Sequence, residues 1–236
     1  LSFPTPGQGP VPNFYTPPPT RLRGLRVGVP LDFFFDHIQL GVAQAVRSAL
    51  SDMQRLSADL VEVRLPHMED INTSARILQS AEASALYSEY RDGSVFGADV
   101  WALIEQGRLV RGTEYVNAQR LRTLFRHEFD LLWNDIDVLV TPATPITAPS
   151  IDAKEVDIDG YKEDVRFAAT RFVRAVNFLG EPALSLPCGF SKDVLSGKPM
   201  PVGLQIIGPP HADLRVLRVG QTLERFLAIY GSASAQ

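Results

Sequence analysis

Apolar positions along the chain predict that strands and helices alternate over its first part. Residues 25–30 alternate in polarity and end at a proline, which predicts a short strand. Residues 41–56 place apolar side chains three and four positions apart, as on the buried face of a helix. Residues 60–65 alternate again and stop at a proline. A strand, a helix and a strand within about 40 residues match a parallel crossover unit, so we expect a sheet covered by helices.

Helices are predicted for the middle of the chain. Residues 70–91 repeat apolar side chains at helical spacing, and residues 100–105 predict a short helix that ends at Gly107. Thr113 is the expected cap of a long helix. The apolar face of that long helix is expected to comprise Leu121, Leu124, Phe125, Phe129 and Leu132.

Buried strands are predicted towards the end of the chain. The almost continuous apolar run at residues 137–142 is typical of a buried parallel strand, and the proline-rich residues 144–150 predict a loop. A helix over residues 165–178 leads into two buried strands within residues 177–209. A last amphipathic helix is expected over residues 212–227.

The acidic segment between these parts allows two interpretations. Glu155, Asp157, Asp159 and Gly160 occupy the first, third, fifth and sixth positions of a calcium-binding EF-hand loop. The twelfth position should hold a glutamate, but it is Arg166, which would repel the ion. We therefore favour a hairpin with its turn at the Asp-Gly pair.

Composition narrows the function classes. Of the 236 residues, 45% are apolar and 21% are charged, as in an ordinary globular protein. The net charge is −4 without a basic stripe, so we expect no nucleic acid and no membrane as partner. No apolar run approaches the roughly 20 residues that span a bilayer. The single cysteine, Cys188, excludes an internal disulfide and predicts a cytoplasmic location.

The first 20 residues are rich in proline and glycine, and they lack the charged and apolar regions of a signal peptide. We expect residues 1–20 to be an extended linker and residues 21–236 to belong to one domain. Because a linker more often joins domains than begins a protein, the chain is expected to be a piece of a longer one.

Local chemistry motifs are sparse. Neither a phosphate-binding glycine loop nor a nucleophile elbow is present, and we expect no metal and no cofactor. Cys188 follows a predicted buried strand and is interpreted as a core residue, as is Ser185. A thiol nucleophile or a zinc site assembled from distant residues stays open as the less favoured alternative. The histidines, none of which pairs with another at helical spacing, are His37, His67, His127 and His211.

Several segments, in this order along the chain, together resemble the C-terminal half of the amidase signature superfamily. They are Leu22–Pro30, Val63–Pro66, Gly107 with Tyr115 and Arg122, Asp137–Pro142 with Pro145 and Ala148-Pro149, Asn177–Gly189 and Pro201–Pro209. The resemblance implies an α/β fold class: a partial amidase-signature fold with a mixed β-sheet core flanked by helices, whose N-terminal catalytic half is missing.

The resemblance also implies hydrolysis of a carboxylic amide by a Ser-Ser-Lys triad, with the lysine taking the proton of the nucleophile. In the family this triad lies upstream of the segments found here. No Gly-Gly-Ser-Ser-Gly-like stretch is present, so we expect no catalytic residue in this chain and no activity from it alone. The lysines that we assign to loops or turns are Lys154, Lys162, Lys192 and Lys198.

This half is expected to supply one wall of the substrate pocket. In relatives, residues ahead of the position that matches Asn177 contribute to that wall, which implies Phe167, Thr170 and Arg174 as substrate-binding residues. Their spacing places them on one helix face, although an ordinary half-buried helix has the same spacing. An arginine in the pocket favours an anionic or carbonyl-bearing substrate, whereas the alternative is a solvated surface charge.

The glutamine-using, tRNA-dependent amidotransferases of the same superfamily differ at two positions. There, a basic pair follows the stretch that matches Gly97–Val100, and an aspartate stands at the position of Thr170; this chain continues instead with Trp101. Both departures favour a general amidase, while Val173 and Ala175 leave the pocket shape open.

The expected partner is a small-molecule amide in the full-length protein, and a homodimer stays open. Two alternatives remain. One is the hydrolytic subunit of such a tRNA-dependent amidotransferase, and the other is a self-contained, non-catalytic α/β domain that binds a ligand or partner.

Overall fold

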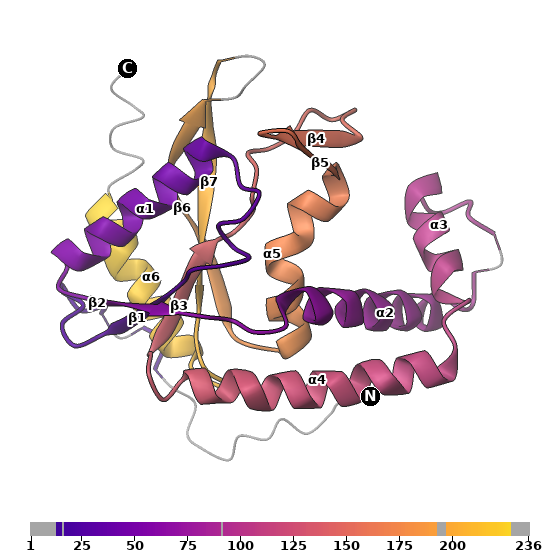
Figure 1. The fold of residues 1–236 in the computed structure, drawn as a ribbon, viewed down its shortest axis with the longest axis horizontal. Helices are drawn as coiled ribbons and strands as arrows, with labels where there is room; N and C mark the ends of the chain where they lie inside the picture. Colours follow the sequence, from indigo (N-terminus) through magenta and orange to yellow (C-terminus); the bar gives the residue numbers. More distant parts are fainter. Residues whose placement is uncertain (1–12, 16, 91, 193–196, 228–236) are drawn as a thin grey trace.

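The computed structural model describes residues 13–15, 17–90, 92–192 and 197–227. A five-stranded mixed sheet forms its centre, in the strand order β2-β1-β3-β7-β6 (Figure 1). The strands are β1 (Arg26–Pro30), β2 (Asp59–Val63), β3 (Val138–Pro142), β6 (Ala183–Lys192) and β7 (Pro199–Ile207). This sheet, with helices around it, confirms the expected α/β fold class.

The parallel part of the sheet arises from the predicted crossover unit. β1 pairs in parallel with both β2 and β3, and α1 (Leu40–Arg55) connects β1 to β2. The buried face of α1 carries apolar side chains at helical spacing, and every residue of β3 is buried. Burial of β3 explains its continuous apolar run, because a strand inside a covered sheet has no solvent face.

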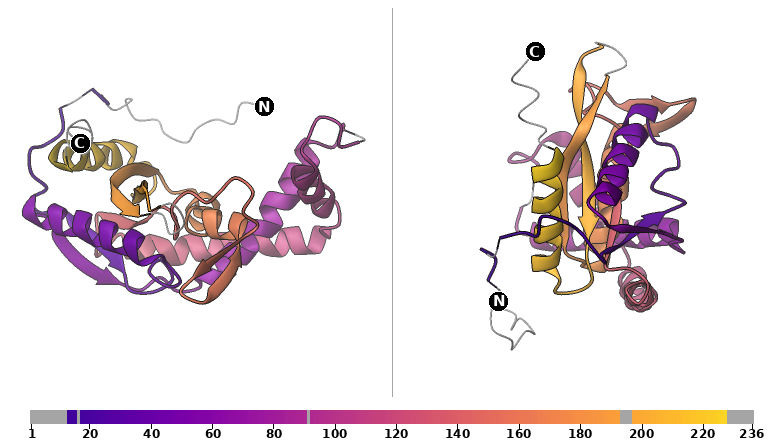
Figure 2. Two further views of the ribbon diagram at one scale, coloured as in Figure 1. Left: turned by 90° about the horizontal axis from the view of Figure 1, so that it is seen from above. Right: turned by 90° about the vertical axis from the view of Figure 1, so that its left-hand side faces the viewer.

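The antiparallel part of the sheet comes from the last two strands. β7 pairs antiparallel with β3 on one side and with β6 on the other, with a bulge in β6 between Pro187 and Gly189. The buried side chain of Gln205 donates to Thr141 Oγ1 at 3.1 Å, which satisfies two polar groups inside the sheet. α1 and α6 (Asp213–Leu227) cover opposite faces of the sheet (Figure 2).

A second group of helices extends away from the sheet (Figure 1). It consists of α2 (Met68–Leu86), α3 (Ala98–Gly107), α4 (Gly112–Leu132) and α5 (Val165–Leu179). α2 packs against the other three helices. Residues 87–90, predicted to continue α2, form a turn instead, in which the rings of Tyr87 and Tyr90 both contact Phe96 edge-on.

Two predictions for α4 were wrong. Its cap is Arg111, not Thr113: the Arg111 backbone N–H donates to Glu114 Oε2 at 2.9 Å, and Thr113 lies inside the helix. Phe125 and Phe129 are buried as predicted, but Leu121 and Leu124 are 40% and 50% exposed. α4 contacts its neighbours along a narrower face than its apolar positions define, so the flank of the predicted face stays uncovered.

The acidic segment forms the predicted hairpin from β4 (Glu155–Ile158) and β5 (Tyr161–Asp164). Asp159 and Gly160 both adopt positive φ, at 53° and 88°, as the two central residues of a type I′ turn require. The hairpin interpretation is therefore confirmed. Within the described residues, no group of His, Cys, Asp or Glu side chains could hold a metal ion.

Most of the proline- and glycine-rich tract, residues 1–12 and 16, lies outside the described residues. Near its end, the Pro19 carbonyl accepts a hydrogen bond of 2.9 Å from Thr222 Oγ1 on α6. Among the described helices, none combines the length and apolar character that crossing a bilayer needs.

Candidate functional site

The three predicted substrate-binding residues lie on α5, and their side chains form one connected group. The Thr170 hydroxyl donates to the Arg166 carbonyl at 2.7 Å and accepts a hydrogen bond from Arg174 Nη2. Phe167 is 41% exposed, and Arg174 is half-buried. The structure thus brings Thr170 and Arg174 into direct contact and keeps Phe167 on the same helix face.

α2 supplies two further residues to this group. Asn72 is buried, and its Oδ1 accepts a hydrogen bond of 3.2 Å from Arg174 Nη1, while its Nδ2 donates to the Met68 carbonyl. Arg76, one turn along α2, lies 5.3 Å from the centre of the Phe167 ring, within the range of a cation–π interaction. The two helices therefore present one polar surface, which we call the α2–α5 face, formed by Asn72, Arg76, Phe167, Thr170 and Arg174.

Sequence reasoning missed Asn72 and Arg76. They lie about a hundred positions from α5, and no motif connects them to it; Asn72 and Arg174 are 102 positions apart. The available signal was weak: Asn72 and Arg76 are four apart on a helix and so share a face. That spacing places two side chains together but does not say which helix they meet.

The electrostatics of the α2–α5 face are unusual for a surface helix pair. Burial lowers the pKa of Arg174, and the positive charge of Arg76 lowers it further, while Glu163 opposes both. Glu163 itself lies 3.4 Å from Arg171, which also donates to the His37 carbonyl at 2.6 Å. The face therefore holds two neighbouring positive charges, and the nearest acidic residue named here is engaged elsewhere.

The other residues considered for chemistry have ordinary roles. Cys188 is buried, and burial raises the pKa of its thiol to about 12, so the thiol stays protonated and packs in the core as predicted. Ser185 is exposed, which corrects its interpretation as a packing residue; the alternation along β6 turns it outwards. Lys154 and Lys198 lie in loops, but Lys162 and Lys192 lie in β5 and β6, so the loop assignment was wrong for these two.

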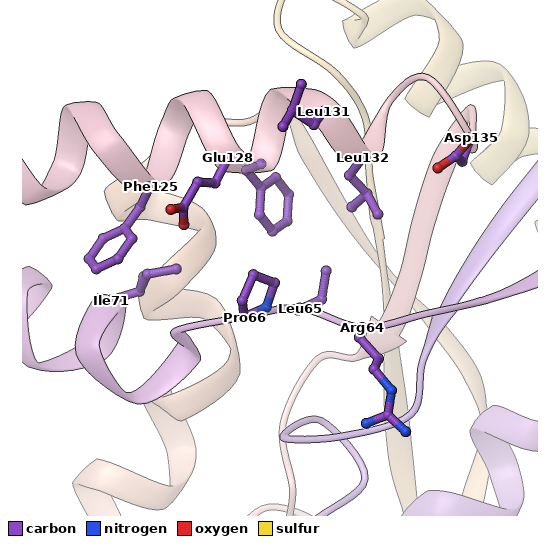
Figure 3. Close-up of a pocket in the computed structure, with 10 residues that line it drawn as sticks. Arg64, Leu65, Pro66, Ile71, Phe125, Glu128, Leu131, Leu132 and Asp135 are labelled. Atoms are coloured by element: carbon purple, nitrogen blue, oxygen red, sulfur yellow. The ribbon is translucent and has the colours of Figure 1, made fainter.

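A cavity of about 210 Å³ lies elsewhere, between α4 and the segment that follows β2 (Figure 3). Apolar side chains form most of its wall, including Leu65, Pro66 and Phe125, and Arg64 extends away from α4. None of the three predicted substrate-binding residues lines it. We therefore place the candidate site at the α2–α5 face.

Comparison with known proteins identifies the family. A family model described as Amidase matches residues 3–217, and the chain belongs to this amidase signature family. An amidase from Pseudomonas putida is 40% identical over 200 residues, which cover 81% of this chain and 43% of that protein. A glutamyl-tRNA(Gln) amidotransferase subunit from Myxococcus xanthus is 34% identical over 249 residues, covering 94% of this chain and 49% of that protein.

Solved structures agree with this assignment. A crystal structure of an amidase superposes with a TM-score of 0.77 at 29% identity, over 87% of this chain and 46% of that one. A structure described as part of a vestigial protein complex related to an s-triazine catabolic enzyme gives a TM-score of 0.75 at 27% identity, over 87% of this chain and 44% of that one. The chain spans about half the length of the curated relatives it matches, so its fold is a partial amidase-signature fold.

Proposed function

We propose that this chain is the C-terminal part of an amidase that hydrolyses a carboxylic amide C–N bond. The observation that carries the proposal is the Amidase family match over residues 3–217, together with 40% identity to a protein named as an amidase. In this proposal the Ser-Ser-Lys triad lies upstream of the chain. The protonated, buried thiol of Cys188 supports that placement, because it is a poor nucleophile.

The chain's own contribution is one wall of the substrate site, formed by Phe167, Thr170 and Arg174. Supporting it, Arg174 is held in one orientation by Asn72 and Thr170. A side chain fixed by its neighbours before the substrate arrives loses less conformational freedom on binding, which is how a binding wall orients a substrate. The partner is accordingly a small amide in the full-length protein.

The second candidate is a glutamine-using component of a tRNA-dependent amidotransferase, because several relatives carry that name at 33–34% identity. Two residues favour the general amidase. Trp101 stacks on Phe96 at 5.8 Å, and the Arg108 guanidinium lies 5.5 Å from its ring, so this position is part of an aromatic cluster. Thr170 offers a hydroxyl where the resemblance implies an aspartate for glutamine.

The test measures ammonia release by the full-length protein and by the isolated chain from aliphatic amides, aryl amides and glutamine. We expect the full-length protein to hydrolyse simple amides, with no turnover by the chain alone. Serine-dependent turnover by the pure chain would overturn the upstream location of the triad. Hydrolysis of glutamine in preference to simple amides would establish the second candidate instead.

Two further proposals concern the full-length protein, namely a cytoplasmic location and a homodimer. Cell fractionation tests the location, and sedimentation equilibrium tests the dimer.

A further inference from the structure

We propose that Arg76 and Arg174 together bind a carboxylate group carried by the amide substrate, so that the enzyme prefers anionic amides. This inference rests on the proposed function, because it assigns a ligand chemistry to the same substrate site. The α2–α5 face then recognises one end of the substrate, and the reacting amide lies at the other end.

The arginines of α5 differ in their partners. Arg166 pairs with Asp164 at 3.0 Å, and Arg171 pairs with Glu163 at 3.4 Å. Over the described parts of the chain, no carboxylate oxygen lies within 4.0 Å of a guanidinium nitrogen of Arg174 or of Arg76. Two cations of this face thus lack the anionic partner that the other two arginines have.

Arg174 is held ready to bind an anion. Asn72 and Thr170 fix the guanidinium through neutral oxygen atoms, which leaves its positive charge uncompensated. A guanidinium has five N–H donors, so donors remain for a ligand. Asn72 is itself oriented by its hydrogen bond to the Met68 carbonyl, so a buried polar residue supports the orientation from α2.

Phe167 positions the second cation. The Arg76 guanidinium lies 5.3 Å from the centre of the Phe167 ring, which keeps an otherwise exposed side chain over α5. Its charge is near enough to lower the pKa of Arg174. Phe167 also offers an exposed ring for the apolar part of a substrate, next to the two cations.

Charge balance points to a carboxylate as the ligand. Two like charges on a partly buried face repel each other, and desolvation adds to the cost of Arg174. A carboxylate between them relieves both effects, because guanidinium groups bind carboxylates through paired, charge-assisted hydrogen bonds. A neutral amide has no group that offsets two positive charges.

The competing explanation is a structural one, in which an acidic residue upstream of this chain pairs with the two arginines. The experiment separates the two. Kinetics of the full-length protein are measured with succinamate, which carries a carboxylate, and with butyramide, a neutral amide of the same chain length. The variants are Arg174→Met, Arg76→Met and the charge-conserving Arg174→Lys, and the matched control is Arg166→Met on the same helix.

We expect Arg174→Met and Arg76→Met to lower the ratio of kcat/KM for succinamate to that for butyramide by roughly ten- to hundredfold. Most of the loss should lie in KM for succinamate, Arg174→Lys should lose less than Arg174→Met, and Arg166→Met should keep the wild-type ratio. An unchanged ratio in both methionine variants overturns the proposal. So does a fall in thermal stability without a change in the ratio, which is the result that the structural explanation predicts.

Failure of the proposed function gives a different result. If the wild-type protein hydrolyses neither amide, that function is wrong, and calorimetric titration of the same full-length variants with succinate decides the binding proposal. Binding that weakens at least about tenfold in Arg76→Met and Arg174→Met, but not in Arg166→Met, supports it. Absence of succinate binding to the wild-type protein overturns it. Arg76 is exposed, so its variant remains informative even if Arg174→Met fails to fold.

Discussion

At the scale of single residues, Glu181 is a carboxyl group that the fold removes from water. It follows α5 and is 8% exposed, and its Oε2 has no hydrogen-bond partner among the described residues. Burial raises its pKa to about 7; the negative charge of Asp130 contributes to the rise, and Arg126 opposes it. The folded protein therefore favours the neutral form of this side chain near neutral pH.

This pKa predicts that Glu181 makes stability depend on pH. The folded state holds the proton more tightly than the unfolded state, whose pKa is near the ordinary value of 4.5. The stabilising effect of protonation is complete below that value and is lost as the pH rises through about 7. Glu181→Gln, which stays neutral, should therefore unfold with a free energy ~1–3 kcal/mol higher than the wild type at pH 8, and nearly equal at pH 5.

Urea unfolding of the full-length protein at both pH values measures this difference. Glu89→Gln is the control, because Glu89 is exposed on the surface after α2. A constant difference between Glu181→Gln and the wild type from pH 5 to pH 8 would show that the Glu181 carboxyl is solvated in the folded state.

At the scale of elements, the contact between α2 and α3 depends on the absence of a side chain at Gly107. A Cβ atom at this position would collide with the Ser80 carbonyl oxygen and would lie 2.9 Å from the Ser84 Cβ atom. Because the first collision is with backbone, side-chain rotation cannot relieve it. The two helices have to separate before any larger residue fits.

Gly107→Ala should therefore destabilise the protein by ~1–3 kcal/mol, as overpacking of a helix contact does. The matched control is Gly112→Ala at the start of α4, where a Cβ atom would meet nothing within 4 Å. The control should be neutral or slightly stabilising, because alanine favours the helix. Equal unfolding midpoints for the two variants in urea would refute the close contact.

At the scale of the whole molecule, the uncovered flank of α4 and the relatives' greater length point the same way. Apolar side chains exposed on this helix are Val116, Leu121, Leu124 and Leu131. Together they form a stripe along one side of α4, as their spacing requires. Exposed apolar patches commonly mark surfaces that another part of a protein covers.

The isolated chain should consequently bind a hydrophobic dye and self-associate. Fluorescence of an anilinonaphthalene dye and sedimentation velocity measure these two properties, with the full-length protein as the control. We expect strong dye fluorescence and aggregates from the chain alone, and neither from the full-length protein. A monomeric chain that melts sharply without binding dye would favour a self-contained domain instead.

Local patterns were sufficient for most elements of this fold. The β1-α1-β2 unit, the type I′ hairpin at Asp159 and Gly160, and the two strands of residues 177–209 were predicted because each depends on neighbouring residues: periodicity, prolines at strand ends and turn chemistry. The family resemblance also came from the sequence, through the order of its segments, and it placed Phe167, Thr170 and Arg174 on one helix face.

Tertiary structure decided what that face touches. The pairing of Arg174 with Asn72 joins residues 102 positions apart, and it is Arg76 on the same helix as Asn72 that adds the second charge. It also decided that Leu121 and Leu124 stay exposed on α4. Apolar spacing defines which side chains can be buried together, whereas the neighbouring helices determine which of them are. The sequence by itself thus determined the elements and the family, and the packing of α2 on α5 assembled the candidate site.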